Sequence, residues 1–128
     1  MKTINKNLAK KLIPLVNKVS DNDPIHSSLK QALFIYFDYG YETTYELYTL
    51  MYELIEIIKE KDLGVYDGNE LALDHSDGIM YMYGPSAERL FNGIKSTLEK
   101  VDFMKGAKAN MRFGPLEGGK NEITVQIK

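Results

Sequence analysis

The sequence predicts a small α+β protein in which helices come first and an antiparallel sheet follows. Apolar residues recur at helical spacing through much of 1–62, and the period then changes to two over most of 63–128. The chain has 128 residues, of which 44% are hydrophobic, so one core can form without disulfides or metals. We therefore expect one domain over 1–128, with a helical part, 1–62, and a ββαββ part, 63–128.

Two or three helices are expected in the first part. An amphipathic helix over 3–19 would carry lysines on its polar side. A second helical region would follow Ser27 or Ser28 and continue to Phe37, with Leu29, Leu33 and Phe34 on its apolar side. A third helix is predicted from about 44 to 61, because the segment Thr43-Thr44-Tyr45-Glu46 fits a capping box.

The third helix has two sides that differ in kind. At 100° per residue, one side gathers aliphatic residues that must face the core: Leu47, Leu50, Met51, Leu54 and Ile58. The opposite side carries three tyrosines among polar residues. Two interpretations of it stay open: packing under the helix 3–19 with hydroxyls in water, or an exposed surface for a protein partner. The candidate partner-binding residues are Tyr45, Tyr48, Tyr52, Glu53 and Glu56.

The second part, 63–128, is predicted to form a mostly antiparallel sheet with helices on one face. Strands are predicted at 69–74 and 79–83, joined by a hairpin through Asp77-Gly78. Ser86 can cap a helix that runs to Val101. Two closing strands, 107–113 and 123–127, alternate apolar and polar residues, so one face of the sheet should meet water, and we expect no aromatic residue on that face.

Charge is segregated along the chain, although the net charge is only −2. Residues 1–20 carry +5 from five lysines, and 21–62 carry −6 from nine acidic against three basic residues. Residues 63–84 carry −4, and 85–128 carry +3. Basic and acidic elements can pair or simply face solvent, or an acidic surface can meet a basic partner.

Composition also restricts location and chemistry. The absence of cysteine excludes disulfides, thiolate zinc sites and cysteine nucleophiles, and the N-terminal segment has no continuous apolar block like that of a signal peptide. No stretch approaches the roughly 20 apolar residues of a membrane span. We therefore expect a cytoplasmic protein that does not interact with membranes.

One acidic segment offers oxygen ligands for a hard cation. Its candidate metal ligands are Asp67, Glu70, Asp74, His75 and Asp77. The spacing lacks the order of a helix-loop-helix calcium site, and β-turns use the same aspartates and glycines. A metal-binding module or a metal-assisted hydrolase is thus the alternative interpretation, and turn chemistry is the favoured one.

No set of residues predicts a catalytic site. The two histidines fall in separate predicted loops, and the glycine-rich segment 114–120 lacks the spacing of a P-loop. An acidic domain without aromatic residues on its wet sheet face also disfavours nucleic acid. We expect a protein without enzymatic activity and without a cofactor.

Three short motifs resemble those of small uncharacterised bacterial α+β proteins. They are Tyr-Asp-Gly-Asn-Glu at 66–70, Tyr-Met-Tyr-Gly-Pro-Ser-Ala-Glu-Arg-Leu-Phe at 81–91 and Met-Arg-Phe-Gly-Pro at 111–115. The resemblance covers 63–115 and implies structural roles only, since no functional residue is assigned in that pattern.

The general profile, small, acidic and free of cysteine, is similar to that of immunity proteins that neutralise a bacterial toxin by covering its active site. A protein that binds a basic toxin domain is therefore the leading expectation. Self-association, for instance as a homodimer, is a further alternative.

Overall fold

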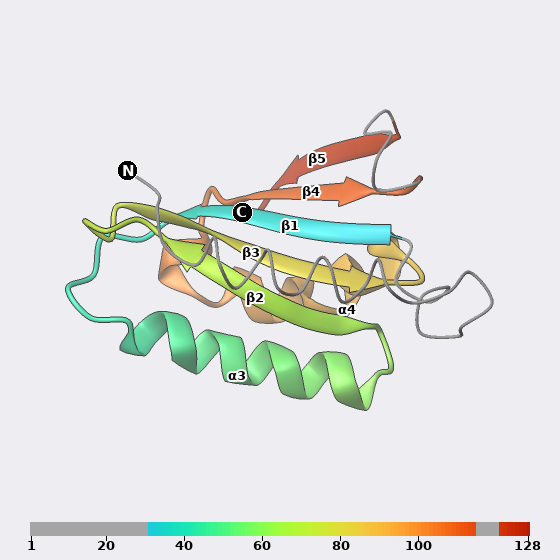
Figure 1. The fold of residues 1–128 in the computed structure, drawn as a ribbon, viewed down its shortest axis with the longest axis horizontal. Helices are drawn as coiled ribbons and strands as arrows, with labels where there is room; N and C mark the ends of the chain where they lie inside the picture. The colour runs from blue at the N-terminus through green and yellow to red at the C-terminus, as the bar shows by residue number, and fades with distance from the viewer. Residues whose placement is uncertain (1–30, 115–120) are drawn as a thin grey trace.

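The structure, a computed structural model, describes residues 31–114 and 121–128 and is α+β (Figure 1). Five strands and two α-helices follow one another in the order β-α-β-β-α-β-β within these residues. The elements are β1 (Gln31–Asp38), α3 (Tyr45–Glu60), β2 (Val65–Leu71), β3 (Asp77–Gly84), α4 (Ala87–Glu99), the short 3₁₀-helix η1 (Asp102–Met104), β4 (Lys108–Arg112) and β5 (Glu122–Gln126).

The five strands form one antiparallel sheet in the order β2-β3-β1-β4-β5. Helices α3 and α4 cover one face of this sheet, as Figure 1 shows. Aliphatic residues of both helices and of that sheet face form one continuous core. Its completely buried members include Leu33, Ile35, Leu47, Leu54, Met80, Met82, Leu90, Ile94 and Leu98.

The prediction of a second helical region is wrong for the residues that the structure describes, because residues 31–38 form the central strand β1. Leu33, Ile35 and Phe37 point into the core, and the residues between them point to the other face of the sheet. This strand is apolar on both faces, so its pattern imitates helical spacing. As a result the described chain opens with a strand, and the expected order of helices followed by ββαββ does not hold.

Helix α3 lies almost where the sequence predicts it, but its N-terminus is capped differently. The Thr44 side chain makes no capping hydrogen bond. Instead, the Tyr39 hydroxyl accepts a hydrogen bond from the Leu47 backbone N–H at 3.1 Å and donates one to the Thr43 carbonyl at 2.6 Å. The buried Tyr39 ring therefore fixes the start of α3 to the end of β1.

The hairpin of β2 and β3 is longer than predicted. Strand β2 begins at Val65 instead of Asn69, and a bulge at Asp67 shifts its register against β3. Gly68 follows the bulge with φ of +122°, a conformation that side chains rarely adopt, so glycine suits this position. The turn itself contains His75, which also has a positive φ, of 62°.

The prediction of helix α4 and of the two closing strands is confirmed. Ser86 caps α4 by accepting a hydrogen bond from the Arg89 N–H at 3.1 Å. Strands β4 and β5 pair with each other, and Ala109 and Met111 of β4 are buried in the core, whereas Ile123 of β5 is 54% exposed. The predicted helix 3–19 and most of the glycine-rich segment lie outside the described residues. None of the described helices is long and apolar enough to cross a membrane.

Replacing Tyr39 tests the link between β1 and α3. In the Tyr39→Phe variant, the Leu47 N–H and the Thr43 carbonyl lose their partner, so the free energy of unfolding should fall by about 1–2 kcal/mol. Urea denaturation followed by circular dichroism measures this difference. Tyr41→Phe removes a hydroxyl from the adjacent ring and serves as the matched control. Equal stability of the two variants would contradict a capping role for Tyr39.

Candidate protein-binding surface

The outward side of α3 exposes aromatic surface to solvent. Tyr45 is 73% exposed, Tyr52 66%, Tyr48 44% and Ile55 37%. These four residues make up half of the eight large hydrophobic residues that are exposed in the described chain. Exposed apolar surface gathered on one element is typical of an interaction site. We call Tyr45, Tyr48, Tyr52 and Ile55 the tyrosine surface.

Helical geometry explains why these residues are exposed together. The buried side of α3 is occupied by Leu47, Leu50, Leu54 and Ile58, which pack into the core. Residues half a turn away from them must then point outward. The structure shows the three tyrosines exposed, and the alternative of packing under the helix 3–19 concerns residues outside the described part of the chain. Their role in binding a partner stays a prediction.

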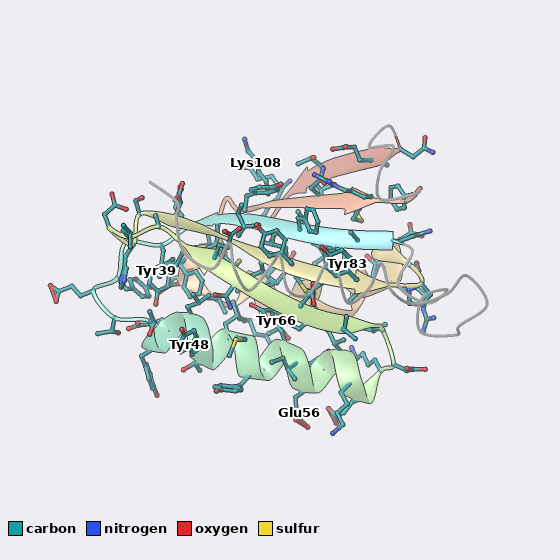
Figure 2. The ribbon with its side chains drawn as sticks, viewed as in Figure 1. Tyr39, Tyr48, Glu56, Tyr66, Tyr83 and Lys108 are labelled. Carbon is teal, nitrogen blue, oxygen red and sulfur yellow. The ribbon has the colours of Figure 1, made fainter. Side chains whose placement is uncertain are left out.

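Carboxylates surround the tyrosine surface. Glu53 and Glu56 are exposed on α3, and Figure 2 shows Glu56 extending from the helix away from the sheet. Residues 31–84 contain eleven acidic residues and only two lysines. The five candidate binding residues therefore lie together on one helix, within an acidic part of the chain.

A groove separates the N-terminal half of α3 from the turn that follows α4. It encloses about 250 Å³ and is lined on one side by Tyr45, Glu46, Thr49, Leu50 and Glu53, and on the other by Tyr41 and residues 100–103. Leu50 and Phe103 are buried and form its apolar floor. Sequence reasoning missed this groove, because its two walls are about 50 residues apart in the chain. We call it the α3–η1 groove.

The five candidate metal ligands do not converge in the structure. Asp67 and Glu70 lie along β2, and the Tyr81 hydroxyl donates a short hydrogen bond to Glu70. Asp74 and His75 lie in the turn before β3, and Asp77 is the first residue of β3. Within residues 31–114 and 121–128, no three His, Asp or Glu side chains are close enough together to hold a metal ion.

Asp74 and His75 each have a hydrogen-bond partner that holds the turn in place. The Asp74 carboxylate accepts a hydrogen bond from the Ser76 N–H at 3.0 Å, and hydrogen bonds from Ser76 lower the pKa of Asp74. The Nδ1 atom of His75 lies 2.8 Å from the Tyr41 carbonyl, to which it can only donate. Both arrangements fit turn chemistry, the interpretation that the sequence favours.

The sheet face opposite the helices carries aromatic residues, contrary to prediction. Phe34 contacts Tyr81 and Tyr83 edge to face, with ring centroids 5.1 and 5.8 Å apart. The Arg112 guanidinium lies 4.5 Å above the Phe34 ring. The expectation of a face without aromatic residues is wrong, because it treated residues 31–37 as helix and so left β1 out of the sheet. The run of aromatic and β-branched residues from Phe34 to Phe37, a composition that favours strands, is the signal that could have found it.

Asp67 and Tyr83 form an electrostatic pair on this face. Burial raises the pKa of the half-buried Asp67 carboxyl from its ordinary 3.8 to about 6. Burial, reinforced by the charge of Asp67 and opposed by Arg112, raises the pKa of Tyr83 to about 12. Desolvation thus disfavours the ionised form of both groups. Figure 2 shows Tyr83 on the sheet, and Tyr48 on α3.

Comparisons with protein-family models, with curated proteins and with solved structures found no match for this chain.

The raised pKa of Asp67 predicts a pH dependence of stability. Between pH 4 and 6 the folded protein holds a proton that the unfolded chain has released, so stability falls as the pH rises through this window. Asp67→Asn removes this ionisation. At pH 7.5 the variant should be more stable than the wild type by about 1 kcal/mol, a value reduced for partial solvation, and the difference should vanish near pH 4. Thermal denaturation across this pH range measures it.

Asp74→Asn is the matched control for Asp67→Asn. The pKa of Asp74 is lowered by its bonds to Ser76, so its ionised form stabilises the fold. The control variant should therefore lose stability at neutral pH and approach the wild type in acid. If both variants lose stability at pH 7.5, Asp67 is not destabilised by burial.

Proposed function

We propose that this protein binds another protein through the tyrosine surface and the adjoining carboxylates of α3, and that it acts by covering a basic surface of that partner. The observation that carries the proposal is the exposure of Tyr45, Tyr48 and Tyr52 on one helix. Tyrosine is enriched at binding hot spots, because its ring supplies large contact area with few rotatable bonds. The residues proposed to contact the partner are Tyr45, Tyr48, Tyr52, Glu53 and Glu56.

The layout of the helix supports a specific interface. Tyr45, Thr49, Tyr52 and Glu56 lie on the outermost line of α3, with Tyr48 and Ile55 along one flank and Glu53 along the other. Exposed tyrosine rings beside carboxylates are consistent with an interface, in which aromatic contacts and polar groups lie together. The helix is held rigidly on the core side by Leu47, Leu50 and Leu54. Little conformational entropy would therefore be lost when a partner binds.

Charge supports a basic partner. The excess of carboxylates over 31–84 would attract a positively charged surface and accelerate its association. Toxins that act on nucleic acid present basic clefts to the phosphate backbone, and an acidic face is complementary to such a cleft. We therefore propose an immunity-type role in the cytoplasm, in which α3 covers the active site of a toxin.

Photo-crosslinking tests the location of the interface. A benzophenone amino acid introduced at position 52 of the full chain should yield an adduct with a basic protein in cells of the native organism. The same amino acid at Glu88, an exposed position of α4, should yield none. An adduct of twice the chain mass would show self-association instead, and equal adducts from both positions would contradict a defined surface.

Alanine substitution measures the contribution of the tyrosines to affinity. The double variant Tyr45→Ala/Tyr52→Ala should bind the crosslinked partner at least 30-fold more weakly, about 2 kcal/mol, because both rings are proposed hot spots. Calorimetry measures the affinity. Leu73→Ala removes a side chain that is 71% exposed elsewhere, and this control should bind normally. All three residues are exposed, so unchanged melting temperatures are expected, and unchanged affinity of the double variant would exclude the tyrosine surface.

A further inference from the structure

We infer that the α3–η1 groove receives an arginine side chain of the partner. The inference rests on the proposed function and identifies the chemistry that the binding surface recognises. The groove adjoins the tyrosine surface, because Tyr45 belongs to both. A partner that covers α3 would therefore reach the groove without a second docking event.

The size of the groove suits one side chain. Its volume of about 250 Å³ lies below the range of about 300–1,000 Å³ in which small-molecule sites usually fall. Buried Leu50 and Phe103 provide an apolar floor for the methylene groups of a long side chain. The rings of Tyr41 and Tyr45 stand at the walls. A long side chain with an apolar stem and a polar end fits these surroundings.

The charges of the groove select a cation. Glu46, Glu53 and Asp102 line it, against one lysine, Lys100. The C-terminus of α4 also ends at this groove, since Lys100 is its C-cap residue, and the carbonyl end of a helix carries partial negative charge. Both contributions favour a positive group over a negative or neutral one.

One carboxylate of the groove is already positioned. The Oε1 atom of Glu46 accepts a hydrogen bond from the Thr43 hydroxyl at 3.1 Å. It also lies 3.4 Å from the Tyr39 hydroxyl, whose single proton is donated to the Thr43 carbonyl at 2.6 Å. A carboxylate positioned before binding loses less side-chain entropy when it pairs with a ligand. The Thr43 side chain at the start of α3 thus positions one carboxylate of the groove.

The combination of tyrosine rings and carboxylates favours arginine over lysine. A guanidinium is planar, stacks on aromatic rings and pairs with carboxylates through several N–H groups. The ammonium of lysine is a strongly hydrated point charge that gains less from an aromatic wall. The groove offers aromatic rings for stacking and carboxylates for pairing in one place.

Titration of the isotopically labelled full chain tests the inference. The probes are N-acetyl-arginine amide, its lysine counterpart and the uncharged isostere N-acetyl-citrulline amide, followed by amide chemical shifts. Arginine should give saturable shifts confined to residues 41–53 and 100–103, with a dissociation constant at least threefold lower than that of lysine. Citrulline should give none. Arginine shifts spread evenly over all acidic segments, or equal shifts with citrulline, would overturn the inference.

Matched variants locate the charge that is required. Glu46→Gln/Glu53→Gln should raise the dissociation constant for the arginine probe at least tenfold, and Glu53→Gln alone, which changes only an exposed residue, should raise it at least threefold. Glu60→Gln/Glu88→Gln makes the same change in charge at exposed positions outside both the groove and the proposed binding residues, and it should leave the constant unchanged. Equal effects of the two double variants would show nonspecific attraction and reject the groove.

The arginine site and the proposed protein-binding role can fail independently of each other. If the position-52 adduct forms but the chain has no arginine-selective site, the partner binds α3 without using the groove, and only the present inference fails. If arginine binds selectively but no adduct forms, the groove stands as a cation site, and the proposed protein-binding role fails.

Discussion

The central position of β1 in the sheet is the constraint on which the rest of the structure depends. β1 lies between β3 and β4, so both of its edges are hydrogen-bonded. Leu33, Ile35 and Phe37 hold the helices on one face, while Phe34 anchors the aromatic cluster of the other. The strand then leads directly to Tyr39, whose hydroxyl caps α3. The position of α3, and therefore of its outward tyrosines, follows from where β1 ends.

The sequence predicts most elements whose residues alternate between core and water. Helices α3 and α4 and strand β4 each have one buried side, and β5 alternates apolar and polar residues, so the period of all four is visible in the order of residues. β1 was missed for the opposite reason. This central strand carries apolar or aromatic residues at nearly every position, and Leu33, Phe34 and Phe37 then match a helix as well as a strand. The choice between the two is made by pairing partners that are distant in the sequence.

The candidate site follows the same division. The clustering of Tyr45, Tyr48 and Tyr52 on one side of α3 is local and could be predicted, whereas their exposure depends on what packs against that side. The α3–η1 groove could not be predicted, because it exists only when the turn after α4 meets Glu46 and Glu53. The separation of Asp67 and Glu70 from Asp74 and His75 likewise depends on how the hairpin extends along the sheet. The candidate metal ligands between 67 and 77 are close in the sequence, but they do not converge in the fold.

The composition of the outward side of α3 is not explained by the stability of the helix. Tyrosine has a lower helix propensity than the lysine, glutamate or alanine that would serve at exposed positions such as 45 and 52. Glu56 and Glu60 place like charges four residues apart, an arrangement that destabilises a helix by a few tenths of a kcal/mol. The core needs neither feature, because Leu47, Leu50, Leu54 and Ile58 already secure the buried side. The proposed binding to a basic partner would account for both, since the rings would gain contact area and the repelling carboxylates would gain counter-charges at the same interface.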